Sequence, residues 1–495
     1  MNRLRAFEPG AGQMASGNGT FLAMIGFALH LVASGAIHAQ EKAAKAADEV
    51  FEDLTKPGSP GCALAVARGG KIIYERGYGL ANIEEDVGIT PRTVFDIGST
   101  SKQFTAASIL LLEKQGKLSV QDDVRKYLPE IPDYGHKITI LHLLNHTSGL
   151  RDYLTLFELA GVNIDSVTTD GDALAIIARQ KALNFEPGSD WLYSNSGFFL
   201  LSVIVKRVSG ETLREFATEN IFEPLQMKHT MFRDEHTLLV PNRALAYDPK
   251  DAGANYTLDV SYFEQTGDGA VHTSVEDLLI WDENFYSGKV GGKDFLDELQ
   301  EPGKLSNGKT LAYAKGLFVG KYRGLRFVDH GGSWGGYRSQ LLRFPEQHFS
   351  VACLCNLANA NPEKRAREVA DVFLAGEMRE PKPAAEPDFE KREKKPTVVL
   401  AAEKLGVYSG HFRSEELLAT YTIGVQDGKL MLQNIQGGDG FMRSSQHLTL
   451  RAAGPETFEG DDEGLEFVFQ RDRQGNVLGF TLDAGRTRGL TFQRK

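Results

Sequence analysis

The sequence predicts a mixed α/β fold with one sheet built from both ends of a long segment, followed by a small all-β module. Strand-like apolar runs occur at residues 61–74 and again at 315–357, and the residues between them have a mainly helical pattern. Beyond Gly406 the pattern changes to short alternating strands separated by turns. The 52 glycines against 18 prolines favour an α/β or α+β fold with many tight turns over a helical bundle.

The N-terminus has the order of an export signal. Two arginines in the first five residues precede an apolar run from Phe21 to Ala33, and small residues end at Ala39. This order predicts cleavage after Ala39, a mature chain in the periplasm or outside the cell, and no stable membrane insertion afterwards. The alternative is an uncleaved anchor, because Thr20–Ala39 is nearly long enough to span a bilayer.

The elements after this leader follow from apolar spacing and turn residues. Residues 41–54 are predicted to be helical, and 61–67 and 71–74 form two strands joined by a Gly-Gly turn. A helix begins near Ser99 and ends before Gly116, a residue type typical of helix ends. Its second half is almost wholly apolar, so we expect this helix to be buried.

The remainder of the first domain returns to strands. The mainly helical stretch extends to Asn284, strand-like runs occupy 315–357, and 362–374 is predicted as a closing helix that begins with proline. Because strands lie at both ends of this segment, we expect a single sheet to receive strands from both.

The last part of the chain is predicted to be a separate module. Residues 377–402 are rich in Pro, Glu, Lys and Ala, which indicates a solvated linker, with a functional basic patch at 391–395 as the alternative. We therefore expect few buried contacts across it. The alternating strands beyond it indicate a small barrel. The predicted division is a leader at 1–39, a main domain at 40–376, a linker at 377–402 and a barrel-like domain at 403–495.

Charge and motif content restrict the partners. The net charge of −11, with no basic stripe of interleaved aromatics, argues against nucleic acid. His-Glu-x-x-His and complete Gly-x-Gly-x-x-Gly patterns do not occur, so neither a metal nor a dinucleotide cofactor is expected. A small-molecule or peptide substrate is the expected partner, and the oligomeric state stays open.

The three cysteines are too few for a disulfide-built scaffold, and their spacing fits no zinc site. Cys62, Cys353 and Cys355 all lie in strand-like runs. The favoured interpretation is buried free thiols. The alternative is one cross-strand bridge from Cys62 to either of the other two, formed in an oxidising compartment.

Ser99-Thr-Ser-Lys102 places a hydroxyl and an amine three residues apart at a helix start, and therefore on one helix face. The helix N-terminus favours negative charge developing on an attacked carbonyl, and burial of Lys102 would lower its pKa toward the range of a useful base. The alternative is an N-cap hydroxyl beside a surface lysine. Ser306-Asn-Gly-Lys309 has the same spacing without the apolar helix.

Two further motifs carry polar side chains at sheet or helix ends. Tyr193-Ser-Asn195 follows a turn, and side chains two apart in an extended stretch point the same way. Tyr193 would move a proton while Asn195 binds a substrate amide or the lysine. In His330-Gly-Gly332 the glycines would let a substrate backbone approach a strand edge. The alternatives are a packing tyrosine and a structural histidine.

In the order Ser-x-x-Lys, Tyr-x-Asn and His-x-Gly, these motifs resemble the serine β-lactamase and penicillin-binding superfamily. The resemblance covers about 51–374, includes 95–99 and 143–150, and is nearest to the class C β-lactamase-like group with its esterases, D-aminopeptidases and carboxypeptidases. Since His330-Gly-Gly332 replaces the usual Lys-Thr-Gly, it argues against β-lactam hydrolysis. The C-terminal module resembles the lipocalin-like domains of some peptidases in this group.

The resemblance implies a three-layer domain, with an antiparallel sheet flanked by helices and a helical subdomain. It implies that Ser99 forms an acyl-enzyme, that Lys102 and Tyr193 share the general-base role, and that the N–H groups of Ser99 and Ser333 form an oxyanion hole. His330 would orient Tyr193 or the substrate.

The expected function is a serine hydrolase of small peptides, D-amino-acid amides or esters. Asn195, Gly332 and Ser333 are the expected substrate-binding residues. Arg338 is interpreted as a surface charge, with binding of a substrate carboxylate as the alternative. His146 is interpreted as structural. The alternative functions are a penicillin-binding-like protein that binds or acylates without turnover, and a true β-lactamase.

Overall fold

The computed structural model describes residues 41–163, 166–250, 255–383, 398, 400, 402–437, 447–460 and 464–495. The predicted leader at 1–39 and most of the predicted linker lie outside these residues. A helical stretch at 41–49 belongs to a unit that ends at Val50, and the chain from Phe51 onward forms a second unit. Within the described residues, no helix has both the length and the apolar character needed to cross a bilayer.

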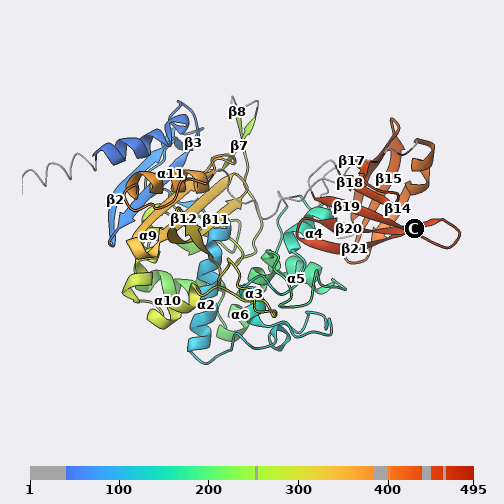
Figure 1. Cartoon of the computed structure of the whole chain (residues 1–495), viewed down its shortest axis with the longest axis horizontal. Coiled ribbons are helices and arrows are strands. Elements are labelled where there is room, and N and C mark those ends of the chain that lie inside the picture. Colours follow the sequence, from blue (N-terminus) through green and yellow to red (C-terminus); the bar gives the residue numbers. More distant parts are fainter. Residues whose placement is uncertain are drawn as a thin grey trace, which may run out of the picture. The chain divides into compact units, whose positions relative to one another are not determined.

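The main sheet has six strands in the order β10-β11-β12-β13-β1-β2, and each neighbouring pair is antiparallel (Figure 1). Its strands are β1 (Cys62–Arg68), β2 (Lys71–Tyr78), β10 (Phe318–Tyr322), β11 (Leu325–Trp334), β12 (Tyr337–Phe344) and β13 (Phe349–Cys355). β1 pairs with β13, so the two ends of the segment meet inside one sheet. The prediction of a single sheet built from both ends is confirmed.

Helices cover both faces of this sheet. Every residue of β13 is buried, which requires cover on both faces. Two of the covering helices are α9 (Val275–Ser287), which contacts β1 and β13, and α11 (Pro362–Phe373), which contacts β12 and β13. The expectation of an antiparallel sheet flanked by helices is therefore confirmed, and α11 begins with the predicted first-turn proline.

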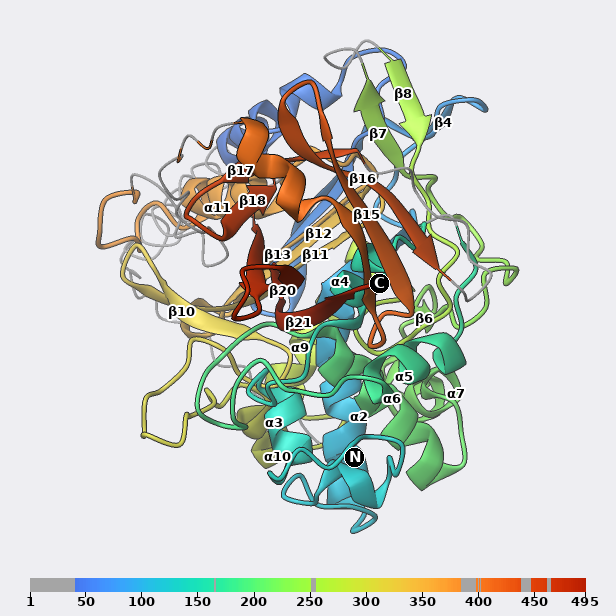
Figure 2. The ribbon, with the colours of Figure 1, turned by 90° about the vertical axis from the view of Figure 1, so that its right-hand side faces the viewer.

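A helical part lies between the two groups of strands in the sequence. Its helices are α2 (Lys102–Lys114), α3 (Ile140–Leu144), α4 (Tyr153–Leu159), α5 (Asp170–Ala178), α6 (Asn195–Ser209), α7 (Leu213–Ala217), α8 (Glu223–Leu225) and α10 (Lys293–Leu299). Helix α2 packs against α6, α7 and α10 and lies at the centre of this part (Figure 2). It is buried along most of its length, as its apolar sequence predicts, and it ends before Gly116, which has a φ of +70°.

Short strands connect these helices. They are β3 (Leu80–Asn82), β4 (Val87–Gly88), β5 (Phe95–Asp96), β6 (Met231–Phe232), β7 (Tyr247–Lys250), β8 (Asn255–Leu258) and β9 (Val271–Thr273). β9 lies between β5 and β6, which brings the segment before Ser99 next to the segment after Asp268.

The C-terminal part is a closed antiparallel barrel of eight strands. Its strands are β14 (Gly410–Ser414), β15 (Ala419–Gln426), β16 (Lys429–Gly437), β17 (Leu448–Ala452), β18 (Thr457–Gly460), β19 (Leu465–Arg471), β20 (Val477–Ala484) and β21 (Thr487–Arg494). The prediction of a small barrel is confirmed. Its interior is filled by rings: that of Phe480 lies 4.6–5.3 Å, centre to centre, from those of Phe412, Phe467, Phe469 and Phe492.

Buried polar contacts join the barrel to the helical part, so the expectation of few such contacts is wrong. Arg151 Nη1 lies 2.6 Å from Glu416 Oε1, and the two side chains are 1% and 5% exposed. The Tyr421 hydroxyl donates to the carbonyl of Leu159 at 2.6 Å. The expectation came from linker composition, which does not show which surfaces the linker allows to meet.

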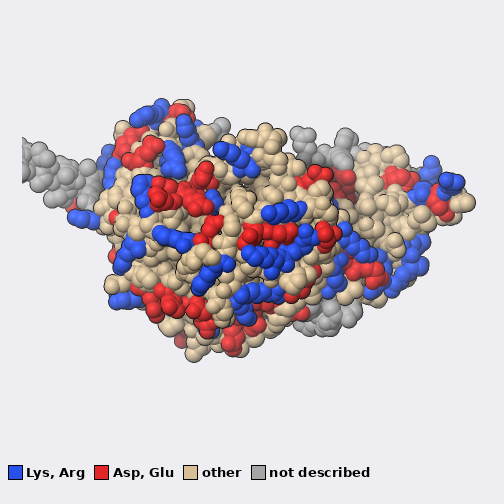
Figure 3. All heavy atoms as spheres, turned by 90° about the horizontal axis from the view of Figure 1, so that it is seen from below, with Lys and Arg blue, Asp and Glu red and all other residues tan. Residues whose placement is uncertain are grey.

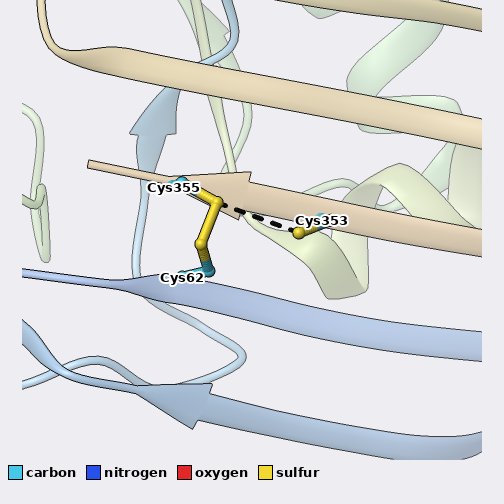
Figure 4. Close-up of side chains that lie close together, drawn as sticks. All are labelled: Cys62, Cys353 and Cys355. Atoms are coloured by element: carbon cyan, nitrogen blue, oxygen red, sulfur yellow. Dashed lines mark hydrogen bonds between the residues drawn. A yellow bond between two sulfur atoms is a disulfide. The ribbon is translucent and has the colours of Figure 1, made fainter. Parts of the chain in front are cut away.

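The prediction that the three cysteines lie in strands is confirmed, whereas the prediction that they are all free thiols is wrong for two of them. β1 and β13 place Cys62 opposite Cys355, and these two form a disulfide (Figure 4). The favoured interpretation of free thiols is therefore wrong for this pair, because strand register cannot be read from spacing. Cys353 is a buried free thiol with its Sγ 3.8 Å from that of Cys355, and burial raises its pKa to about 12.

Candidate active site

Ser99 lies in a short 3-10 turn at Gly98–Ser101 that continues into α2. Gly98 has a φ of +48°, and a Cβ there would lie 2.8 Å from the backbone nitrogen of Ser333. Glycine therefore allows this turn to pass close to strand β11. The Asp96 carboxylate accepts a hydrogen bond of 2.8 Å from Gly98 N–H, which fixes the turn. Ser99 is left partly exposed at the surface of a cavity.

The predicted pair of Ser99 and Lys102 is brought together with Asn195. The fully buried Lys102 Nζ lies 3.0 Å from Ser99 Oγ and 2.9 Å from Asn195 Oδ1. It also donates to the backbone carbonyl of Asp268. Asn195 is the first residue of α6. Of the two roles predicted for it, binding of the lysine is the one that the structure shows. By contrast, Ser306-Asn-Gly-Lys309 lies in an exposed turn.

Burial shifts the pKa values of Lys102 and of the neighbouring Asp268. It lowers the pKa of the amine well below its ordinary value, the Asp268 carboxyl opposes this shift, and the Arg486 guanidinium adds to it. Burial also raises the pKa of Asp268, whose Oδ2 accepts a hydrogen bond of 3.0 Å from the Tyr153 hydroxyl. Both effects favour the uncharged forms, because a charge is poorly solvated in this interior.

Tyr193 packs against the lysine. Its ring centre lies 4.9 Å from Lys102 Nζ, and its side chain is nearly fully buried. Burial raises the pKa of the phenol well above its ordinary value, and the nearby Ser99 and Arg486 offset only part of this shift. Tyr193 is thus protonated at neutral pH. Its hydroxyl lies near Ser99, so both groups can contact the same bound molecule.

His330 is held as a neutral imidazole. Its Nδ1 lies 2.6 Å from the Gly331 carbonyl and therefore carries the proton, so Nε2 accepts from the Tyr313 hydroxyl at 3.1 Å. Burial, with a smaller contribution from Lys102, lowers the pKa of His330 to about 3. Tyr313 is thus its side-chain partner among the described residues, and the ring centres of His330 and Tyr193 are 6.2 Å apart.

Gly332 lines the cavity. Its lack of a side chain was predicted to admit a substrate backbone, but in the structure it admits a segment of the chain itself. A Cβ at Gly332 would lie 1.9 Å from the carbonyl oxygen of Ile97, so the absent side chain admits the segment before Ser99 rather than a substrate backbone. This close packing brings the Ser333 N–H beside the turn that carries Ser99.

Residues 47–375 of this chain match the family model described as Beta-lactamase. The chain belongs to the beta-lactamase family. As a member of this family it is a hydrolase. The matched span contains Ser99, Lys102, Tyr193 and His330.

Curated relatives of this beta-lactamase-family chain include penicillin-binding protein 4* of Bacillus subtilis (strain 168), which is 30% identical over 382 residues. That match covers 72% of this chain and 81% of the relative. A D-aminopeptidase of Brucella anthropi is 25% identical over 517 residues, which cover 88% of this chain and 95% of the relative.

Solved structures show the same fold. The octameric penicillin-binding protein homologue from Pyrococcus abyssi has a TM-score of 0.61 and 23% identity, and it covers 91% of this chain and 99% of its own. The D-amino acid amidase from Ochrobactrum anthropi SV3 has a TM-score of 0.56 and 21% identity over 68% of this chain and 99% of its own.

Arg338, whose alternative interpretation is binding of a substrate carboxylate, makes hydrogen bonds within its own hairpin. It lies at the start of β12, and its Nη1 donates to the carbonyls of Gly335 and Tyr337 at 2.5 and 2.6 Å. It lines the same cavity as Ser99, but these two backbone bonds occupy one nitrogen of its guanidinium.

Several residues of this beta-lactamase-family site were not predicted from sequence. They are Tyr153, Asp268, Tyr313 and Arg486. They approach the Ser99 region from separate parts of the chain, and no short motif marks any of them. His146, predicted to be structural, accepts from Ser194 N–H at 3.1 Å through Nδ1, and its ring lies 4.2 Å from that of Tyr193.

The cavity itself measures about 1610 Å³ and opens to solvent. It is lined in part by Ser99, Tyr193, Asn195, Asp268, His330 and Arg486. Ser99 and Tyr193 therefore line a space large enough for a small peptide or ester, and the Lys102 amine lies buried behind Ser99.

Proposed function

We propose that this chain hydrolyses small peptides, D-amino-acid amides or esters through an acyl-enzyme on Ser99. The proposal rests chiefly on the surroundings of Lys102 Nζ. Two of its three neighbours, the side-chain oxygen of Asn195 and the carbonyl of Asp268, only accept hydrogen bonds. A neutral amine has two N–H groups and one lone pair. With both N–H groups donated to these acceptors, the lone pair faces Ser99 Oγ at 3.0 Å.

This arrangement supports Lys102 as the general base. In the proposed reaction Lys102 takes the Ser99 proton while Oγ forms a bond to the substrate carbonyl carbon. The oxyanion then receives hydrogen bonds from the N–H groups of Ser99 and Ser333. Each such donor contributes about 3–4 kcal/mol to the stability of the transition state. General-base transfer contributes about 10²–10⁴-fold in rate.

Tyr193 is proposed as the proton donor to the leaving group. Its raised pKa keeps the phenol protonated at neutral pH, and in the proposed reaction the proton that Lys102 took from Ser99 then replaces the one that Tyr193 gives. The C–N or C–O bond breaks and the acyl group stays on Ser99. Water then attacks the acyl carbon and gives a proton to Lys102. The bond from the acyl carbon to Ser99 Oγ breaks, Lys102 returns the proton to Oγ, and the carboxylic acid product leaves.

The substrate class is supported by the relatives and by His330. The Brucella anthropi relative is named a D-aminopeptidase. His330 is neutral where the superfamily has a lysine, so a β-lactam carboxylate lacks a permanent cation there. We therefore expect slow or absent β-lactam hydrolysis. Asn195, Gly332 and Ser333 are proposed to line the bound substrate.

A second candidate is acylation without turnover, which the name of the Bacillus subtilis relative favours. A substrate panel tests the two candidates: a p-nitrophenyl ester, D-alanine amide and nitrocefin, each assayed for repeated turnover and for the mass of the protein. Turnover of the ester or the amide with little nitrocefin hydrolysis supports the proposal. A persistent acyl mass on Ser99 without turnover contradicts it and supports the second candidate.

Export is also proposed. It is supported by the order of residues at the N-terminus and by the Cys62–Cys355 disulfide, because such bonds persist in oxidising compartments.

A further inference from the structure

His146 is a buried residue with an uncommon backbone conformation. Its φ is +59°, in the left-handed region, where a side chain crowds the backbone of any residue except glycine. Its exposed fraction is 1%. A costly conformation of this kind persists only where the surrounding contacts fix it. The contacts of His146 must therefore compensate the cost of this conformation.

The hydrogen bonds of His146 lie on both sides of Tyr193 in the sequence. The His146 carbonyl accepts from Leu192 N–H at 3.1 Å, and its Nδ1 accepts from Ser194 N–H at 3.1 Å. Ser194 has an extended backbone and is the last residue before α6. The backbone before and after Tyr193 is therefore bound to one residue, which limits where the phenol can lie.

The imidazole ring also packs against the Tyr193 ring. The two ring centres are 4.2 Å apart, and the ring planes are inclined by 34°. The imidazole centre lies 5.1 Å from the ring centre of Phe198 and 4.6 Å from that of Tyr313. Since the imidazole is enclosed by these other rings, it limits how far the Tyr193 ring can shift or turn.

The His146 imidazole is neutral and has one tautomer. A backbone N–H only donates, so Nδ1 carries no proton and Nε2 carries it. Burial lowers the pKa of His146 well below its ordinary value, and the charge of the nearby Lys102 adds to this shift. Protonation of Nδ1 would set two N–H groups against each other. The hydrogen bond to Ser194 therefore persists at neutral pH.

We propose that His146 is a positioning residue that holds the Tyr193 hydroxyl within reach of Ser99 and of the leaving group. This inference rests on the proposed function, in which Tyr193 gives a proton to the leaving group. Such a transfer needs its two heavy atoms within about 2.6–3.2 Å of each other, so a small shift of the ring slows it. His330 is less well placed for this role, because its ring centre is 6.2 Å from that of Tyr193 and its Nε2 accepts from Tyr313.

Two esters with the same acyl group test the assignment on the full chain: ethyl butyrate and p-nitrophenyl butyrate. Ethoxide must receive a proton as it leaves, whereas p-nitrophenolate leaves without one. The ratio of kcat/KM for the ethyl ester to kcat/KM for the p-nitrophenyl ester therefore reports proton donation to the leaving group. Loss of folded protein lowers both values equally and does not change this ratio.

Tyr193→Phe lacks the phenol and should lower this ratio about 10²–10⁴-fold. His146→Asn keeps an acceptor for Ser194 N–H and tolerates the left-handed region, but it lacks the ring. We expect it to lower the ratio about tenfold to hundredfold, the effect of a misplaced group. His146→Phe keeps a ring without the acceptor and should also lower the ratio. In the Tyr193→Phe background, His146→Asn should change the ratio no further, because no phenol remains to be positioned.

His136→Asn is the control, the same substitution at a side chain that is 46% exposed, and it should keep the wild-type ratio. A wild-type ratio in His146→Asn, or in His146→Phe where the first variant does not fold, would overturn the assignment. A further fall of the ratio in the double variant would also overturn it. In both cases a lowered ratio in Tyr193→Phe leaves the proposed function standing. If Tyr193→Phe keeps the wild-type ratio, or if the wild type cleaves neither ester and Ser99 does not react with a fluorophosphonate, both fail.

Discussion

Lys102 is the proposed general base, an amine that burial drives toward the neutral form. A base must be deprotonated to accept a proton, and the deprotonated fraction rises with pH through the pKa. Burial lowers the pKa of Lys102, so this rise occurs at lower pH than for an exposed lysine. For a neutral ester, kcat/KM should therefore be low in acid and reach a plateau well below pH 10. A pH–rate profile measures this, and a rate still rising at pH 10 would rule out a depressed lysine as the base.

Lys102 and Tyr193 are expected to behave as one proton-transfer unit. Lys102→Ala and Tyr193→Phe should each lower kcat by about 10²–10⁴-fold, since each removes a step in the same proton path. The double variant should be little worse than the poorer single variant. Lys309→Ala, in the exposed motif of the same spacing, is the control and should keep wild-type kcat. Losses that multiply in the double variant would show that the two groups act independently.

At the scale of single residues, the sequence predicts those contacts that follow from the spacing of residues along one helix. Ser99 and Lys102 are three apart at a helix start, so their contact follows from helix geometry. Asp268 and Arg486 reach the site through turns, and nothing in their local sequence indicates which cavity they line. The resemblance implies that His330 orients Tyr193 or the substrate; the structure pairs its ring with Tyr313, and its role toward a substrate stays a prediction.

At the scale of elements, the critical contact is between β11 and the turn before α2. Gly332→Ala adds a methyl group where the Ile97 carbonyl lies 1.9 Å from the Cβ position. Because backbone must move to relieve this clash, we expect a loss of about 1–3 kcal/mol in the free energy of unfolding and a lower kcat. Gly88→Ala is the control, since a Cβ there meets nothing within 4 Å. Urea unfolding of both variants gives the comparison, and equal stability would contradict the packing argument.

The elements themselves were largely predictable. The apolar run in α2 predicts a buried helix, and strand-like runs at both ends predict a shared sheet. The strand order was not predictable, because it depends on which residues pair across β1 and β13. The disulfide follows from that same register.

At the scale of the whole molecule, the barrel is attached by the buried pair of Arg151 and Glu416. Glu416→Ala leaves a buried guanidinium without its carboxylate, so we expect the free energy of unfolding to fall by about 3–5 kcal/mol. Glu415→Ala, next to it but exposed at a surface pair with Arg413, should leave the urea midpoint nearly unchanged. Equal midpoints for the two variants would show that the buried pair does not hold the barrel.

Composition predicted the barrel but not its contacts. Alternating strands and turns indicate closure into a barrel, whereas the surface it presents to the rest of the chain depends on side chains far apart in sequence. On the face shown in Figure 3, Lys and Arg side chains are interspersed with Asp and Glu, so charge alone gives no preferred docking surface there.

The central claim is that Ser99 is the nucleophile, and covalent labelling tests it most directly. The full chain is incubated with a fluorophosphonate and analysed by intact mass, and the modified peptide is sequenced by mass spectrometry. We predict one added group, located on Ser99, in the wild type and in Ser306→Ala, and no addition in Ser99→Ala. Labelling at another serine, or unchanged labelling of Ser99→Ala, would contradict the account.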